Sequence, residues 1–187
     1  SKQPFHIFPA VNTLFKGLLD QPNFKDLDFS SLRLSQAGGM AATEQTAARW
    51  LEVTGCPMIE GWGMTECVAV GTNNIVIDRK FNGTIGTPGP SVDIIVIDED
   101  GKEVGVNQAG ELCIKGPNVM SGYFNKDSSS DFTEDGYFRT GDIVSMDEKG
   151  YFRLLDRKKD MILVSGFNVF PNEIESVMLD CKGIIEC

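Results

Sequence analysis

The chain has 187 residues, of which 41% are hydrophobic, and its formal net charge at pH 7 is −10. This length and apolar content suffice to bury a core, as one domain or two small ones. The acidic balance argues against a nucleic-acid partner, because phosphate binding requires concentrated lysine and arginine.

Several other classes of protein are also disfavoured. No run approaches the roughly 18 apolar residues of a membrane-spanning helix, and the first ten residues lack the pattern of a signal peptide. The five cysteines are scattered without a Cys-x-x-Cys pair, which fits reduced thiols better than a disulfide framework or a zinc site. His6 is the only histidine, so a Ser-His-Asp or Cys-His nucleophile is nearly excluded.

The first part of the chain alternates between helical and strand patterns. An apolar stripe at helical spacing predicts a helix over about Pro9–Leu19. Leu32–Ser35 and Pro57–Glu60 are typical of short strands, and Ala42–Thr54 between them predicts a second helix. This alternation favours a layered, parallel sheet.

The second helix carries its own boundary signals. Thr43 is the candidate N-cap and Gly55 the terminator. The spacing of Ala47, Trp50 and Leu51 predicts that these side chains face the core.

The pattern changes near Phe81 to short strands separated by turns. Asp100-Gly101 and Asp147–Gly150 are the turn signals. The predicted strands are Val92–Ile97, Glu111–Lys115, Ile143–Met146 and Tyr151–Leu155. The natural interpretation of this region is a small antiparallel barrel or meander.

Residues Asp156–Glu175 form the most informative segment. The charged run Asp156–Asp160 leads into a strand-like stretch, Met161–Val164, and then into a helical pattern that begins at Pro171. Taken alone, the charged run is typical of a solvated face.

This segment gains meaning from two motifs upstream. Gly61-Trp62-Gly63-Met64-Thr65-Glu66 and Thr140-Gly141-Asp142 precede Asp156–Glu175 in this order. Together the three motifs resemble the adenylate-forming enzymes, which include acyl-CoA synthetases, peptide-synthetase adenylation domains and luciferases. The resemblance covers nearly the whole chain and is closest to the bacterial long-chain fatty-acid–CoA ligases.

The resemblance implies an α/β fold plus a small antiparallel β-barrel, followed by the start of a C-terminal α+β domain. Residues 1–80 are expected to end the layered part of the large N-terminal domain, and residues 81–155 to form the barrel-like subdomain. Residues 156–160 are expected to be a hinge, and residues 161–187 to begin the C-terminal domain.

Activating a carboxylic acid with ATP brings two anions together, and Mg²⁺ and polar donors must offset their repulsion. Thr65 offers a hydroxyl to the α-phosphate, and the Glu66 carboxylate suits the hard cation. Gly61 and Gly63 allow close approach of the backbone to a ligand, and Trp62 offers a flat face to adenine. A tight turn between a strand and a loop is the structural alternative for these residues.

The resemblance also implies roles for four further residues. The Asp142 carboxylate is expected to accept hydrogen bonds from the ribose hydroxyls, with Arg157 as a second ribose or phosphate contact. Lys159 is identified as the hinge position between the adenylate-forming and thioester-forming conformations. Gly166 corresponds to the glycine beside the pantetheine arm of CoA.

The resemblance also places a loop at Gly38-Gly39-Met40 beside the adenine and the acyl tunnel, although two glycines after a strand often simply make a turn. Thr65, Glu66 and Lys159 are the candidate catalytic residues, and Glu66 is the candidate metal ligand. The candidate nucleotide- and CoA-binding residues are Gly38, Gly39, Met40, Glu60, Gly61, Trp62, Gly63, Met64, Thr65, Asp142, Arg157 and Gly166.

The implied activity is that of an ATP-dependent acid–thiol ligase with fatty acid, ATP and CoA as substrates. An adenylation domain that loads an amino or aryl acid onto a carrier protein, and a non-catalytic nucleotide-binding module, remain as alternatives. The expected location is the cytoplasm, with peripheral association at the inner face of the membrane left open. The sequence does not indicate the oligomeric state or the length of the acyl chain.

Members of the resembled family carry a phosphate-binding loop near the beginning and a catalytic lysine near the end. No Gly-x-x-x-x-Gly-Lys-Ser/Thr stretch or comparable loop occurs here. We therefore expect the chain to be a middle-to-late piece of a longer enzyme, and to be inactive alone.

Overall fold

A computed structural model describes residues 4–74, 80–165, 167–179, 181 and 183–184. The chain divides into two compact units. The first unit comprises residues 1–92 and 116–120, and the second comprises residues 93–115 and 121–187. The domain limits expected from the sequence stay predictions.

The first unit is built on a sheet that begins with parallel strands. β1 (Ile7–Ala10) pairs with β2 (Leu34–Ala37), and β2 pairs with β3 (Met58–Trp62), both in parallel. β4 (Thr72–Asn73) and β5 (Thr87–Pro88) extend this sheet in antiparallel fashion. The predicted parallel, layered arrangement is confirmed.

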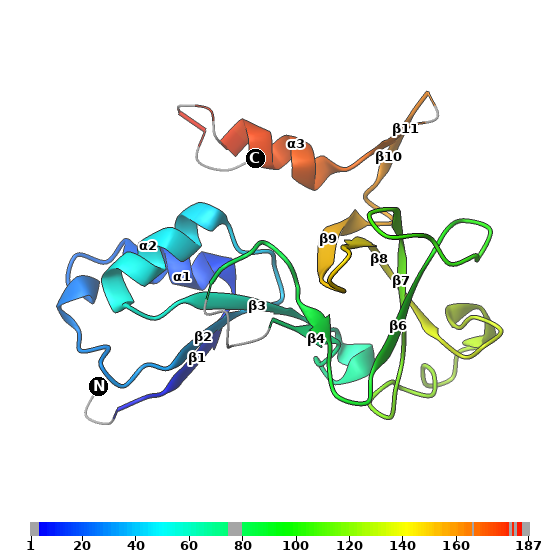
Figure 1. Cartoon of the computed structure of the whole chain (residues 1–187), viewed down its shortest axis with the longest axis horizontal. Helices are drawn as coiled ribbons and strands as arrows, with labels where there is room; N and C mark the ends of the chain where they lie inside the picture. Colours follow the sequence, from blue (N-terminus) through cyan, green and yellow to red (C-terminus); the bar gives the residue numbers. More distant parts are fainter. Residues whose placement is uncertain (1–3, 75–79, 166, 180, 182, 185–187) are drawn as a thin grey trace. The chain divides into compact units, whose positions relative to one another are not determined.

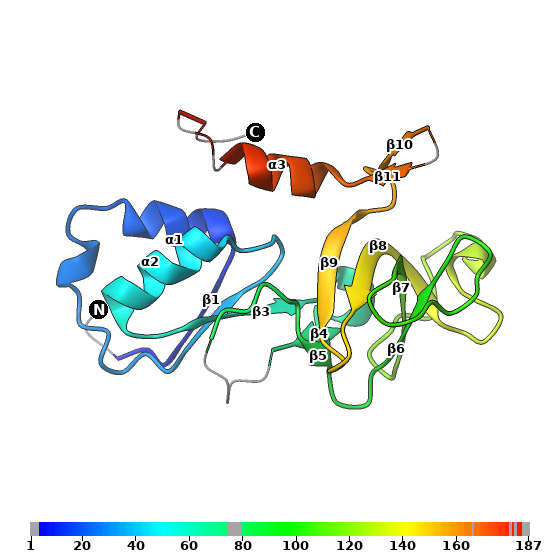
Figure 2. The ribbon, with the colours of Figure 1, turned by 45° about the horizontal axis from the view of Figure 1, so that its top comes forward.

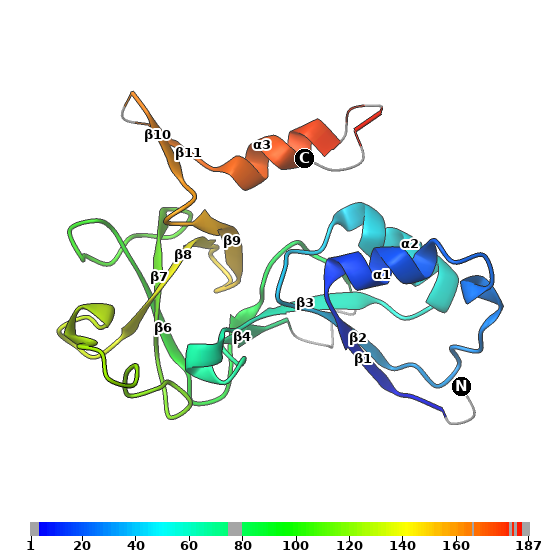
Figure 3. The ribbon, with the colours of Figure 1, turned by 180° about the vertical axis from the view of Figure 1, so that it is seen from behind.

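Two helices, α1 (Asn12–Leu19) and α2 (Glu44–Thr54), lie on the same face of the β1-β2-β3 sheet (Figures 1 and 3). α1 begins later than predicted because Pro9 and Ala10 belong to β1. The predicted cap of α2 is confirmed, since Thr43 Oγ1 accepts a hydrogen bond from the Thr46 amide at 3.2 Å. The described residues also include the short 3-10 helices η1 (Phe24–Asp26), η2 (Thr65–Cys67) and η4 (Ser129–Asp131).

The core between these helices and the sheet centres on Trp50, which is 1% exposed. Its ring stacks on Phe8 with centroids 5.6 Å apart and meets Phe15 edge-on at 4.6 Å. Its indole Nε1 donates to Ser35 Oγ at 2.8 Å, which satisfies the buried polar end of the ring. The prediction for Leu51 was wrong, because this side chain is 47% exposed on the outer side of α2.

The second unit contains an antiparallel sheet in the order β6-β7-β8-β9. Its strands are β6 (Asp93–Ile97), β7 (Ala109–Lys115), β8 (Phe138–Met146) and β9 (Phe152–Arg157). Each strand pairs with the next along the chain, so the described strands form an open meander, and closure into a barrel is not confirmed.

After β9 the chain enters a hairpin of β10 (Ile162–Val164) and β11 (Phe167–Val169), which leads to α3 (Pro171–Leu179) (Figure 2). The predicted strand and helix in this segment are confirmed. No helix in the described ranges is long and apolar enough to cross a membrane.

We expect Trp50→Ala to lower the free energy of unfolding of this chain by about 3–5 kcal/mol, because it removes the largest buried ring and leaves a cavity. The neighbouring Leu51→Ala should change it by about 0.5 kcal/mol, since about half of the Leu51 surface is exposed. Urea denaturation followed by circular dichroism measures both variants. Equal losses would contradict the assignment of the core to Trp50.

Candidate functional site

The first group of candidate residues lies where β2 and β3 end. Because these strands are parallel, their carboxyl ends meet at one edge of the sheet, where α/β folds commonly bind ligands. Gly38 follows β2, and a Cβ atom built on it would lie 3.6 Å from the carbonyl oxygen of Gly61 on β3. The structure therefore brings the Gly38–Met40 loop next to the Gly61 motif.

Glu60 supports the loop at this edge. Its side chain is buried, and its carboxylate Oε1 accepts a hydrogen bond from the amide of Ala42 at 2.8 Å. The backbone carbonyl of Glu60 accepts from the Asn74 side chain at 3.0 Å. Glu60 thus fixes the path of the chain after Met40, and a direct contact with a nucleotide stays a prediction.

Close packing explains why glycine occupies positions 61 and 63 of the motif. A Cβ atom on Gly63 would collide with the backbone of Ala69, and one on Gly61 would collide with the Asn73 and Gln36 side chains. Trp62 is 8% exposed, and its ring covers Gly71. This burial favours a role for Trp62 in shaping the loop, while stacking on adenine stays a prediction.

Thr65 and Glu66 lie in the short helix η2, directly after the motif glycines. Thr65 is exposed and Glu66 is partly exposed. Cys67 holds the turn in place, because its buried Sγ lies 3.4 Å from both the amide and the carbonyl oxygen of Met64. The Thr65 hydroxyl and the Glu66 carboxylate therefore extend from a turn that Cys67 holds in place.

The residues after this turn adopt unfavourable backbone conformations. Val68 and Ala69 have φ angles of 55° and 56°, a region that costs a residue other than glycine about 1–2 kcal/mol. Asn118 holds this backbone by donating from Nδ2 to the carbonyl oxygens of Cys67, at 2.9 Å, and Val70. Backbone strain that the surroundings enforce is common at functional sites.

Sequence reasoning missed Asn118, because nothing in the local sequence connects it with a turn some 50 positions earlier. The next contact in the same segment reinforces it, since the Met120 amide donates to the Glu66 carbonyl oxygen at 2.8 Å. Asn118 and Met120 therefore hold the turn that presents Glu66.

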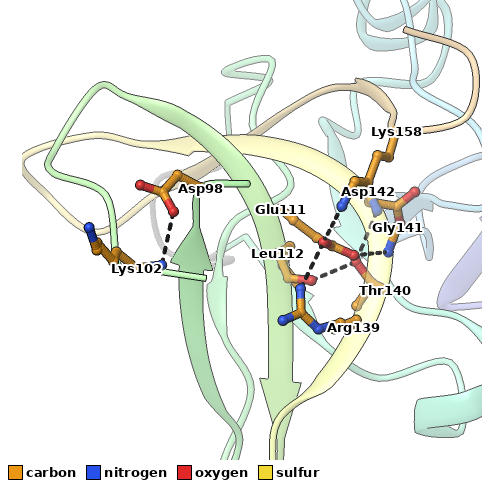
Figure 4. Close-up of polar contacts among 9 residues, drawn as sticks. All are labelled: Asp98, Lys102, Glu111, Leu112, Arg139, Thr140, Gly141, Asp142 and Lys158. Atoms are coloured by element: carbon orange, nitrogen blue, oxygen red, sulfur yellow. Dashed lines mark hydrogen bonds and ion pairs between the residues drawn. The ribbon is translucent and has the colours of Figure 1, made fainter. Parts of the chain in front are cut away.

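The second group of candidate residues lies on a bulge of β8 (Figure 4). Glu111 pairs with Ile143 and Cys113 pairs with Arg139, so Leu112 alone faces Thr140–Asp142. Gly141 has φ 73°, which glycine adopts without steric cost.

The hydroxyl of Thr140 fixes the shape of this bulge. It donates to the Leu112 carbonyl oxygen at 2.8 Å and accepts from the Asp142 amide at 3.1 Å. These two contacts set the direction in which the chain leaves Gly141 and place Asp142 at the end of the bulge.

Asp142 and Arg157 are paired across β8 and β9. The Arg157 Nε lies 3.6 Å from the Asp142 Oδ1, and the Asp142 side chain is largely buried while that of Arg157 is exposed. The sheet thus brings together two residues that the sequence separates, and it leaves the guanidinium accessible.

The predicted hinge, residues 156–160, begins with the last two residues of β9 and continues as a turn, in which the Asp160 amide donates to the Arg157 carbonyl oxygen at 3.0 Å. Lys159 is exposed in this turn. Buried Asp156 accepts from the Asn172 amide at 3.1 Å, which connects β9 to the beginning of α3. Gly166 lies outside the described residues.

Cys113 lies on β7 next to the bulge and is fully buried. Burial raises the pKa of its thiol to about 12, and the Glu111 carboxylate acts in the same direction. The neutral thiol predominates at physiological pH, so Cys113 serves packing and is a poor nucleophile.

The chain is similar to known proteins over nearly its whole length. The AMP-binding enzyme family matches residues 1–124. The chain belongs to this family. The long-chain-fatty-acid–CoA ligase of Haemophilus influenzae is 52% identical over 182 residues, which are 95% of this chain and 32% of the ligase.

Solved structures of other proteins are also similar to this chain. ATP-bound MatB from Rhodopseudomonas palustris superposes with a TM-score of 0.88 at 35% identity, over 97% of this chain and 36% of MatB. O-succinylbenzoate coenzyme A synthetase from Bacillus subtilis, in complex with ATP and a magnesium ion, gives a TM-score of 0.83 at 31% identity, over 97% of this chain and 38% of that one. The chain spans about a third of the length of the curated relatives that it matches.

We expect Gly63→Ala to lower the free energy of unfolding by about 1–3 kcal/mol, because the new methyl group meets the Ala69 backbone, which cannot move aside cheaply. Gly17→Ala is the matched control. Gly17 lies inside α1, and a methyl group added there would meet no atom within 4 Å, so this variant should gain about 0.5–1 kcal/mol. Thermal unfolding measures both, and two shifts of the same sign would contradict the close approach at Gly63.

Proposed function

We propose that the protein containing this chain is an AMP-forming long-chain fatty-acid–CoA ligase. The observation that carries the proposal is the 52% identity with the Haemophilus influenzae ligase across 95% of the chain. A carboxylate oxygen of the fatty acid attacks the α-phosphorus of ATP, and pyrophosphate leaves. The CoA sulfur then attacks the acyl carbonyl carbon, AMP leaves with the shared oxygen, and the thiol proton is released.

Thr65 and Glu66 serve the first half-reaction. The exposed Thr65 hydroxyl donates to the α-phosphate, where negative charge is concentrated as the carboxylate approaches. The partly exposed Glu66 carboxylate, on a turn held by Asn118 and Met120, fits a Mg²⁺ ion. One carboxylate is sufficient, because Mg²⁺ is usually bound through one or two carboxylates together with substrate phosphates and water.

The remaining nucleotide contacts follow from the family resemblance. Asp142 accepts hydrogen bonds from the ribose hydroxyls, and the accessible Arg157 guanidinium contacts ribose or phosphate. Residues 38–40 and 60–64 form the adenine side of the site, with Glu60 and Trp62 supporting the loop. The MatB and O-succinylbenzoate CoA synthetase structures bound to ATP support ATP as the nucleotide.

Lys159 is the pivot that separates the two half-reactions, and Gly166 lies beside the pantetheine arm of CoA in the second. Both roles come from the family resemblance. The exposed position of Lys159 in a turn between β9 and the C-terminal hairpin supports the first, because hinge residues are usually a few positions at the ends of elements.

The substrates we propose are a fatty acid, ATP and CoA, and the location we propose is the cytoplasm. Peripheral contact with the inner face of the membrane stays a prediction. Pyrophosphate exchange by the full-length protein, across fatty acids of increasing length and across amino and aryl acids, tests the substrate class. Exchange driven by fatty acids supports the proposal. Exchange driven only by amino or aryl acids supports the carrier-protein alternative, and no exchange with any acid supports a non-catalytic module.

We expect Glu66→Gln in the full-length protein to slow pyrophosphate exchange by about 10²–10³-fold at limiting Mg²⁺, because an amide is a poorer ligand for a hard cation. Glu52→Gln removes a carboxylate from the exposed side of α2 in the same unit and should leave the rate unchanged. A Glu66→Gln rate within a few-fold of wild type would assign Glu66 a structural role.

Lys159→Pro in the full-length protein should retain pyrophosphate exchange and lose thioester formation from supplied acyl-AMP. Proline fixes φ near −65°, so a residue that must change φ between two conformations would be held in one. Lys159→Ala is the control, since it removes the side chain and leaves the backbone free. Equal effects of proline on both half-reactions, in a folded variant, would mean that the pivot lies elsewhere.

A further inference from the structure

Glu111 on β7 has a buried carboxylate that the proposed mechanism does not use. The residue is 5% exposed. In the described part of the chain three groups donate to it: Arg139 Nη1 at 3.4 Å, the Gly141 amide at 3.2 Å and Lys158 Nζ at 2.9 Å (Figure 4). A carboxylate buried at this depth requires such partners, and removing one side of the contact is costly.

The three donors belong to two segments of the second unit, β8 and the turn that follows β9. Arg139 precedes the β8 bulge, Gly141 is its central residue, and Lys158 follows β9 within the predicted hinge, residues 156–160. The two oxygens of the Glu111 carboxylate accept from different donors. Oε1 accepts from Gly141, and Oε2 accepts from both cationic side chains.

A second contact joins the same two segments. The Lys158 amide donates to the carbonyl oxygen of Gly141 at 2.8 Å. Gly141 is thus held by Glu111 through its amide and by Lys158 through its carbonyl group. Lys158 is held through both its backbone and its side chain, and the next residue is the predicted pivot, Lys159.

We propose that Glu111 is a positioning residue that locks the Thr140–Asp142 bulge to Lys158, so that Asp142 and Arg157 present one fixed surface to the nucleotide. This inference rests on the proposed function, in which Asp142 and Arg157 bind the ribose. Glu111 acts through Gly141 and Lys158 and does not itself contact the substrate. The contacts of Glu111 end at Lys158, so we expect the chain up to Lys158 to stay fixed while the hinge moves the residues after it.

The test measures AMP binding by titration calorimetry in the full-length protein. Glu111→Gln keeps an acceptor for Gly141 but replaces Oε2 with a donor that faces Lys158 and Arg139. We expect the Kd for AMP to rise about tenfold to 100-fold, the scale for a lost hydrogen bond to a charged group. Lys158→Met breaks the same contact from its exposed end and should raise the Kd about two- to fivefold.

The double variant separates positioning from general destabilisation. If both substitutions break one contact, Glu111→Gln with Lys158→Met should bind AMP as Glu111→Gln does alone. Asp98→Asn is the matched control, because Asp98 is a carboxylate of the same unit that accepts from the Lys102 amide at 2.9 Å (Figure 4). It should leave the Kd unchanged.

Each result decides the proposal. The proposal is overturned if the Kd of folded Glu111→Gln lies within twofold of wild type. It is also overturned if the increase in Kd of the double variant equals the product of the two single increases. If Glu111→Gln does not fold, an unchanged Kd in Lys158→Met overturns it and a raised Kd supports it. Absence of AMP binding by the wild-type protein would instead refute the proposed function.

Discussion

The bulge in β8 is the constraint on which the second unit's candidate site depends. In this bulge, residues 140–142 lie opposite Leu112 alone. The Thr140 hydroxyl holds it by donating to the Leu112 carbonyl oxygen and accepting from the Asp142 amide. The bulge adds two residues to β8 between its pairs with Glu111 and Cys113, and Asp142 is the last of the three residues in it. At the end of the bulge, Asp142 lies across from Arg157 in the register of β8 with β9.

In the first unit, the core and the strand direction position the candidate residues. Its core around Trp50 fixes the helices to the parallel strands, and the parallel direction of β2 and β3 puts the loops that follow them at one edge. The turn with Thr65 and Glu66 then continues into strained residues at Val68 and Ala69. Such a conformation persists only because neighbouring groups, Asn118 among them, hold the backbone in place.

Buried carboxylates support the candidate residues of both units through two kinds of partner. Glu60 and Asp156 are buried carboxylates that accept from the backbone, and each ties a loop or a helix beginning to a strand. Glu111 accepts from side chains as well as from the backbone. Asp156 also accepts from the Arg157 amide, which fixes the backbone from which the exposed Arg157 side chain extends.

The sequence by itself determined the family, the alternation of helices and strands, the cap of α2 and the identity of the exposed candidate residues. These features rest on local spacing, on turn chemistry and on motifs that need no partner far along the chain. Only the tertiary structure decided that Leu51 is exposed, that Asn118 supports the turn that carries Glu66, and that Glu111 joins Gly141 to Lys158. Burial and hydrogen bonds between distant segments depend on strand register, which local patterns do not specify.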